Sequence, residues 1–288
     1  MIERKPEWLH VEFSRKEVQA VADMMNRLNL HTVCREANCP NMGECYRKRT
    51  ATFLILGENC TRHCRFCNVS KNRACSLDPD EPAHVADAAV KLGLKHVVVT
   101  SVTRDDLPDG GAEHFVKTVQ AIRAALPDAN IELLVPDFKG DFNAVDMVVD
   151  AEPDIFAHNV ETVPRLYAQV RPEADYDRSV SVLAYAKLRR PGMVTKTGIM
   201  VGLGETEAEV VQVMDDLVRV GVDILTVGQY LRPTKAHLPV AEYVTPQQFD
   251  RYARLGRERG LKYVFSAPLV RSSYHAAEAF DTVKSPGV

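Results

Sequence analysis

The chain has 288 residues, 45% of them hydrophobic and 26% charged, which is typical of a globular protein. A net charge of −3 and a pI near 6.3 argue against a surface dominated by nucleic-acid binding. No apolar run approaches the roughly 18 residues that span a bilayer, and the first ten residues lack the apolar core of a signal peptide. We therefore expect a cytoplasmic protein that has neither a membrane nor a nucleic acid as its partner.

The first fifty residues are expected to form an N-terminal extension, residues 1–50, outside the main fold. Apolar residues at helical spacing predict a short helix around Ser14–Asn29. A loop rich in cysteine, with Pro, Asn and Gly among its residues, is expected to follow that helix.

From Thr52 onward, short apolar runs alternate with amphipathic helical stretches. The runs are rich in Val and Ile and show little polar alternation, as expected of parallel strands that are buried on both faces. The predicted strands are Thr52–Gly57, His96–Ser101, Ile131–Val135, Asp154–His158, Lys196–Val201 and Asp223–Gly228. A capping box at Thr206 and Glu209 and the pair Thr245–Pro246 mark the starts of two of the helices.

Alternating strands and helices predict an α/β fold with a parallel sheet and helices outside it. Six such units are fewer than the eight of a closed TIM barrel. We therefore predict a partial (β/α)6 TIM-type barrel over residues 51–261. A C-terminal extension, residues 262–288, would cover or flank its open side.

The seven cysteines are strongly clustered, because six of them lie between Cys34 and Cys67. A disulfide framework suits a small secreted domain, whereas clustered cysteines in a reducing compartment indicate metal. The seventh, Cys75, stands outside both of the spacings described next and is expected to be no ligand.

The downstream set is Cys60, Cys64 and Cys67, in the order C-T-R-H-C-R-F-C directly after the first predicted strand. Three thiolates at this spacing can hold three irons of a [4Fe–4S] cluster and leave the fourth iron open, whereas full ligation normally takes four cysteines. Zinc is the alternative, with His63 as a further possible ligand, although zinc sites usually show paired C-x2-C units or added histidines.

The upstream set is Cys34, Cys39 and Cys45, spaced C-x4-C-x5-C. It predicts a second metal site, and the alternatives are a zinc knuckle or unrelated buried thiols. The Arg271-Ser272-Ser273-Tyr274 run near the C-terminus would by itself be an ordinary surface turn.

Together these motifs resemble a known family. The C-x3-C-x2-C pattern after a first strand resembles the radical S-adenosylmethionine (SAM) superfamily, in which the open iron chelates SAM. The upstream C-x4-C-x5-C run and the Arg-Ser-Ser-Tyr motif resemble the lipoyl synthases, and this likeness covers nearly the whole chain. The resemblance implies two [4Fe–4S] clusters, with Ser273, or its neighbour Ser272, as fourth ligand of the auxiliary cluster. Arg65, where many members have proline, is a departure that should not touch the ligands.

The same resemblance implies contacts to SAM. Phe66 matches the aromatic position near the adenine, although it could simply be a core aromatic. Met200 lies on the glycine-rich run Thr197–Glu205, which is similar to the adenine-contacting strand of the superfamily. Asn159 and Arg171 are expected to make polar contacts to SAM, the latter to its carboxylate.

The implied activity is radical insertion of sulfur at C6 and C8 of a protein-bound octanoyl-lysine, with the auxiliary cluster as sulfur donor. Cys60, Cys64, Cys67 and Ser273 would be the catalytic residues. The implied partners are an octanoylated lipoyl carrier, an electron donor such as ferredoxin or flavodoxin, and an iron–sulfur carrier. The competing interpretations are another radical SAM enzyme, such as a biotin-synthase-like sulfur inserter or a methylthiotransferase, and a non-catalytic iron–sulfur or zinc scaffold.

Overall fold

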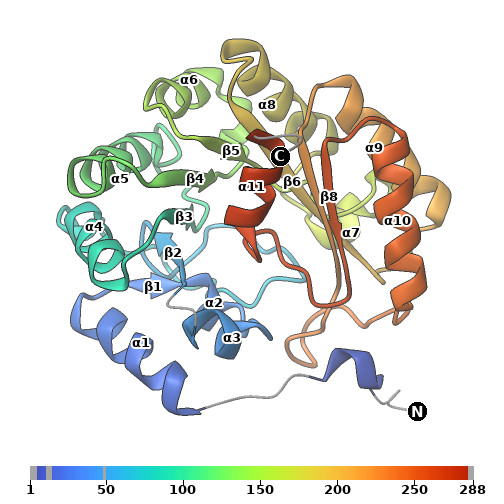
Figure 1. Ribbon diagram of the computed structural model, residues 1–288, viewed down its shortest axis with the longest axis horizontal. Coiled ribbons are helices and arrows are strands. Elements are labelled where there is room, and N and C mark those ends of the chain that lie inside the picture. Colours follow the sequence, from blue (N-terminus) through green and yellow to red (C-terminus); the bar gives the residue numbers. More distant parts are fainter. Residues whose placement is uncertain (1–4, 11–14, 48–49, 285–288) are drawn as a thin grey trace.

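A computed structural model describes residues 5–10, 15–47 and 50–284, and its centre is one eight-stranded sheet (Figure 1). The strands run in sequence order from β1 to β8, with β1 antiparallel to β2 and every other pair parallel. Their bounds are β1 His31–Thr32, β2 Thr52–Ile55, β3 His96–Ser101, β4 Asn130–Leu134, β5 Ile155–Ala157, β6 Val194–Val201, β7 Ile224–Gln229 and β8 Tyr263–Ser266. Because β1 and β8 are the two ends of the sheet, the barrel is open, and the predicted partial barrel is confirmed.

Helices form a ring outside the sheet (Figure 1). The ring helices are α4 Glu81–Leu92, α5 Ala112–Ala125, α6 Phe142–Asp150, α8 Tyr176–Arg189, α9 Glu207–Arg219 and α10 Pro246–Glu258. The shorter helices are η1 Glu7–Leu9, α2 Val33–Glu36, α3 Met42–Arg47, η2 Phe138–Gly140, η3 Pro164–Leu166 and α7 Tyr167–Val170, and α1 spans Arg15–Arg27. None of the helices in the described part of the chain has the length and apolar character needed to cross a membrane.

The helix boundaries follow the capping signals of the sequence. The Glu209 amide donates to the Thr206 hydroxyl, and the Thr206 amide donates to the Glu209 carboxylate, so the expected capping box is present at the start of α9. Thr245 caps α10, with Pro246 in its first position. The N-terminal helix was expected over Ser14–Asn29, and α1 covers its interior, whereas Ser14 lies outside the described residues.

All six predicted strands are present, but the sheet is longer than six strands. The seventh parallel strand, β8, pairs with β7 and lies within residues 262–288, the predicted C-terminal extension. Its four residues are too few to show a clear periodicity. At the other edge, His31 pairs with Leu54, which makes β1 part of the sheet. The expected cysteine-rich loop also contains two short helices, α2 and α3, the first capped by Thr32.

The final helix, α11 (Ala276–Lys284), lies across the barrel rather than outside it, near the centre of Figure 1. Phe280 of α11 packs with Ile155, Val194 and Ile224, which stand at the beginnings of their strands. Its ring meets His96 edge-on, with ring centroids 6.0 Å apart. Helix α11 therefore closes the amino-terminal end of the barrel, and the loops at the carboxyl ends of the strands stay available for a site.

Candidate functional site

The six clustered cysteines form two separate groups in the structure. Cys34 lies on α2 and Cys45 on α3, with Cys39 in the turn between these helices. The other three lie in the loop that follows β2, at the carboxyl end of the first parallel strand: Cys60, Cys64 and Cys67. All seven cysteines are free thiols, and Cys75 stands apart with its sulfur accepting a hydrogen bond from Asn59 at 3.1 Å. We call the first group the α2–α3 trio and the second the β2-loop trio.

Within each trio the thiols lie close enough to change one another's pKa. Burial, reinforced by the neighbouring thiols of the same trio, raises the pKa of Cys34 and of Cys67 to about 12. Burial also raises the pKa of Cys39 and Cys64. Thiols that resist ionisation alone become thiolates when iron binds, and half-buried soft donors in groups of three suit an iron–sulfur cluster.

An arginine lies beside each trio. Arg171 is 8% exposed and its charge opposes the rise in the pKa of Cys64. The charge of Arg271 likewise opposes the rise in the pKa of Cys39. Positive charge next to thiolates stabilises them, so the donor chemistry of both trios fits a cluster with net negative charge.

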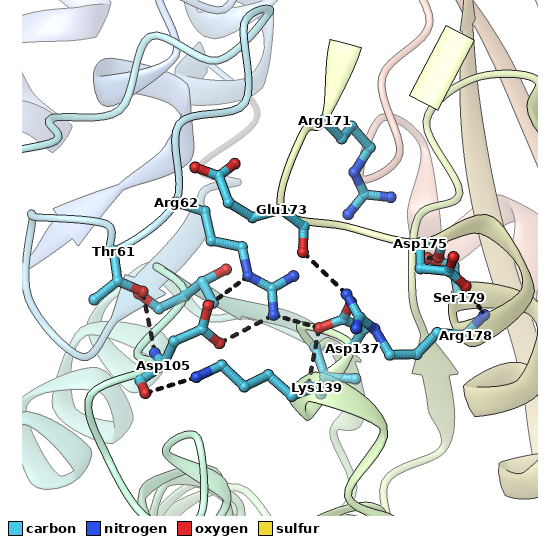
Figure 2. Close-up of polar contacts among 12 residues, drawn as sticks. Thr61, Arg62, Asp105, Asp137, Lys139, Arg171, Glu173, Asp175, Arg178 and Ser179 are labelled. Carbon is cyan, nitrogen blue, oxygen red and sulfur yellow. Dashed lines mark hydrogen bonds and ion pairs between the residues drawn. The ribbon is translucent and has the colours of Figure 1, made fainter. Parts of the chain in front are cut away.

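The β2-loop trio is held in place by a buried ion network around Arg62 (Figure 2). The Arg62 guanidinium donates to both oxygens of Asp105, at 2.7 and 3.0 Å, and to Asp137 at 2.6 Å. Arg178 of α8 donates to the other oxygen of Asp137 at 2.8 Å. Burial opposes ionisation of Asp137, but the hydrogen bonds and charge of Arg62 outweigh it, so its pKa lies well below its usual range.

Backbone and hydroxyl contacts complete this anchor. Thr61 donates its hydroxyl to the carbonyl of Thr103 at 3.0 Å and accepts a hydrogen bond from the Asp105 amide at 3.0 Å. Lys139 donates to the Asp105 carbonyl at 3.1 Å (Figure 2). The cysteine loop is thus fixed to the loops after β3 and β4. No local sequence signal marked Arg62, because its partners Asp105 and Asp137 lie far away in the sequence.

Two of the residues expected to contact SAM have unused polar atoms. The Oδ1 atom of Asn159 and the Nε atom of Arg171 are buried and have no hydrogen-bond partner among the described residues. Arg171 donates through Nη1 to the Asn159 carbonyl at 2.9 Å, so the two residues lie together after β5. Buried polar atoms without a partner are rare in folded proteins, and a polar ligand at this position would satisfy them.

The two expected apolar contacts lie on the same side of the barrel. Phe66 and Met200 are both half-buried and pack against the core cluster formed with β6, β7, α9 and α10. Gly198 on β6 allows a close approach there, because a Cβ atom would lie 2.7 Å from Thr226 Oγ1 and 3.0 Å from Asn159 Oδ1. The four residues expected around SAM therefore lie near the carboxyl ends of β5 and β6 and on the cysteine loop.

Glu161 is a site residue that sequence analysis missed. Its φ of 65° is in the left-handed region, where a residue of this kind is strained by about 1–3 kcal/mol, and such strain concentrates at functional sites. Burial raises the pKa of Glu161, although the charge of Arg171 opposes this rise. Asn159 donates to its carboxylate at 3.1 Å. Its position directly after β5, two residues beyond Asn159, was the signal that could have identified it.

The end of the chain lies against the α2–α3 trio. Tyr274 donates its hydroxyl to Glu44 of α3 at 2.7 Å, and Asn41 donates its side-chain amide to the Leu269 carbonyl at 2.8 Å. Gly228 of β7 makes room for this segment, because a Cβ atom there would lie 2.1 Å from the Val270 carbonyl oxygen. The expected return of the C-terminal segment to the N-terminal cysteines is present.

The two serines of the Arg271–Tyr274 run differ in their surroundings. The Ser272 hydroxyl accepts a hydrogen bond from the side-chain amide of Asn159 at 3.2 Å. Both serines are half-buried in the turn before α11. Ser272 therefore contacts Asn159, one of the residues expected around SAM, whereas Ser273 is the serine that the family resemblance implies as a ligand of the α2–α3 trio.

Comparison with known proteins gives consistent matches. The model of the radical SAM superfamily matches residues 54–217. A lipoyl synthase of Caldanaerobacter subterraneus subsp. tengcongensis is 57% identical over 276 residues, which are 96% of this chain and 97% of that protein. A lipoyl synthase of Rubrobacter xylanophilus is 57% identical over 275 residues, which are 95% of this chain and 86% of that protein.

Among solved structures, HydG, a maturase of the [FeFe]-hydrogenase, has a TM-score of 0.59 and 12% identity, covering 97% of this chain and 72% of HydG. At this low identity the likeness shows a shared fold and nothing more.

Proposed function

Because this chain belongs to the lipoyl synthase family of the radical SAM superfamily, we propose that it inserts sulfur at C6 and C8 of a protein-bound octanoyl-lysine to give a lipoyl group. The cofactors of this family are SAM and two [4Fe–4S] clusters. The observation that carries the proposal is the pair of separate cysteine trios, one after the first parallel strand and one against the chain's end. A protein that holds a single cluster, or a zinc scaffold, would not need both cysteine trios.

The ligand assignment follows the two trios. The β2-loop trio, Cys60, Cys64 and Cys67, would hold the cluster that binds SAM, and the α2–α3 trio, Cys34, Cys39 and Cys45, would hold the auxiliary cluster. Ser273 would be the fourth ligand of the latter, and an oxygen donor is weaker than a thiolate at a soft site. When bound, the first cluster supplies the electron that splits SAM into methionine and a 5′-deoxyadenosyl radical, and the auxiliary cluster supplies the sulfur.

In this proposal, the protein's own side chains bind SAM and orient the cysteine loop. Asn159 Oδ1 and Arg171 Nε, the buried unpaired atoms, would contact the polar groups of SAM, with Arg171 facing its carboxylate. Phe66 and Met200 would pack against the adenine. Arg62 keeps the β2 loop rigid through Asp105 and Asp137, and this fixes where the three thiolates stand.

The proposed partners follow from this activity. The substrate would be an octanoylated lipoyl carrier domain or protein. An electron donor such as ferredoxin or flavodoxin would supply reducing equivalents, and an iron–sulfur carrier would replace the sulfur that is consumed. The free thiols suit a reducing compartment, and we propose the cytoplasm as the site of action.

The assignment is tested by replacing each trio with alanine. The Cys60/Cys64/Cys67→Ala variant should lose SAM cleavage and keep about half of the cluster iron, since each trio holds one four-iron cluster. The Cys34/Cys39/Cys45→Ala variant should cleave SAM but give no sulfur-inserted product from an octanoyl-lysine peptide. Iron and sulfide analysis, deoxyadenosine release and mass spectrometry of the peptide are the measurements.

Cys75→Ala is the matched control, because it removes a thiol outside both trios and should keep all the iron and both activities. Deoxyadenosine release by the first triple variant would overturn the assignment of the SAM cluster. Sulfur insertion by the second would overturn the role of the α2–α3 trio.

A further inference from the structure

A shallow depression lies beside the β2 loop. It has a volume of about 550 Å³, and its lining includes Cys60, His63, Lys71, Asn72, Arg73 and Asp106. Cys60 thus connects this surface to the β2-loop trio. Further along the same loop, the charges of Arg171 and Glu161 reach Cys64.

Charged groups of both signs stand at or near the rim of the depression. Asp106 is paired with Arg104, which donates to its two oxygens at 2.8 and 2.8 Å, and His63 contacts Glu173 at 3.0 Å.

Lys71 and Arg73 have no carboxylate partner among the residues that the structure describes. Lys71 donates to the Cys64 carbonyl at 3.1 Å, and Arg73 is exposed. Two cations that lack a carboxylate partner in the described ranges therefore border a concave surface that reaches a thiol of the trio, on a protein whose net charge is −3.

Electron transfer between proteins falls steeply with the distance between redox centres, so a protein donor must approach the cluster as closely as possible. The depression reaches Cys60, a proposed ligand of the SAM cluster, so a carrier seated on it would stand close to that cluster.

We propose that this depression is the docking surface for an acidic one-electron carrier protein, a flavodoxin in the test below; the proposal rests on the proposed function. Lys71 and Arg73 steer the acidic face of the carrier to the loop. Each SAM cleavage consumes one electron, so the carrier is oxidised by one electron in each encounter, and one lipoyl group takes two encounters. Repeated exchange requires weak, fast and salt-dependent binding rather than a permanent complex.

The test uses the holoenzyme and a bacterial flavodoxin of net negative charge. Arg73→Glu should raise the Kd for flavodoxin on the order of tenfold at low ionic strength, and this effect should shrink as salt is added. Asn72→Lys adds a cation at the same rim and should lower that Kd. Arg257→Glu is the matched control, because Arg257 is exposed and lies at the end of α10, which leads into the amino-terminal end of β8.

Deoxyadenosine release driven by flavodoxin should change in parallel with the Kd, whereas release driven by dithionite should stay at the wild-type rate in every variant. An unchanged Kd for Arg73→Glu, or an equal change for Arg257→Glu, would overturn the docking surface. So would a loss of turnover of an octanoylated carrier with dithionite, which would assign the surface to the substrate. Absence of dithionite-driven SAM cleavage in the wild type would instead contradict the proposed function.

Discussion

Arg62 lies within the cysteine loop, and its side chain is only 4% exposed. Replacing it with alanine would leave Asp137, which is fully buried, without its closest cation. Losing one partner of a buried ion pair typically costs about 3–5 kcal/mol. We expect about 3 kcal/mol for Arg62→Ala, at the lower end because Arg178 still pairs with Asp137. Urea unfolding is the measurement.

A double variant separates the ion pair from simple loss of packing. Arg62→Ala combined with Asp137→Asn should destabilise by clearly less than the sum of the two single changes, because the second change removes the charge that the first leaves unpaired. Additive effects would show that Arg62 and Asp137 do not act together.

His158 gives the protein a predictable sensitivity to acid. Burial and the charge of Arg171 lower the pKa of His158 to about 4, so the ring is neutral in the folded protein at neutral pH. The unfolded chain takes up a proton near its ordinary pKa of about 6.5, so stability is lost as the pH falls from about 6.5 towards 4. Between pH 7.5 and pH 5 this should amount to about 2 kcal/mol.

His158→Asn should remove that dependence, since asparagine does not titrate and can still donate to the Val135 carbonyl, which the ring contacts at 2.8 Å. Urea unfolding of both proteins at several pH values is the measurement. Identical slopes against pH in this range would rule out the role assigned to His158.

At the scale of elements, the contact between the final turn and α3 holds two distant segments together. Tyr274→Phe removes the hydrogen bond to Glu44 and should weaken this contact by about 1–2 kcal/mol. Because the loss is local, amide hydrogen exchange should speed up in residues 269–275 and in α3, while the midpoint of global unfolding changes little. Tyr243→Phe is the control, since the Tyr243 hydroxyl has no hydrogen-bond partner in the described ranges. Unchanged exchange in Tyr274→Phe would show that this bond does not secure the segment.

Elements with a strong local signal were predictable from the sequence. The six predicted strands and the caps of α9 and α10 depend on apolar runs and on residues close together in the chain. Strand β8 and helices α2 and α3 were missed because each is short and is stabilised by its neighbours rather than by its own pattern. The same reason applies at the site: the cysteine spacings are local, whereas the partners of Arg62 and Tyr274 are set only by the fold.

For the whole molecule, α11 closes the end of the barrel opposite the site. Phe280 is 5% exposed and fills the space between the starts of three strands. Phe280→Ala should destabilise by about 3–5 kcal/mol, the range for removing a large aromatic side chain from a core. Thermal or urea unfolding measures this. Leu188→Ala, at a position that is 76% exposed, should change stability by less than about 0.5 kcal/mol. Equal effects of the two changes would mean that α11 does not act as a closure.

The contact between Glu44 and Tyr274 joins residues 230 positions apart, and the one between Asn41 and Leu269 joins residues 228 apart. Contacts of such long range form late, because a large loop must close first. During synthesis, the α2–α3 trio leaves the ribosome long before residues 269–274, which contact it, have been translated. The β2-loop trio is anchored by Asp105 and Asp137, which lie in the first half of the chain, whereas the contacts that cover the α2–α3 trio need residues 269–274. A chain that is cut before residue 269 would therefore keep the anchor of the β2-loop trio and lose the contacts that cover the α2–α3 trio.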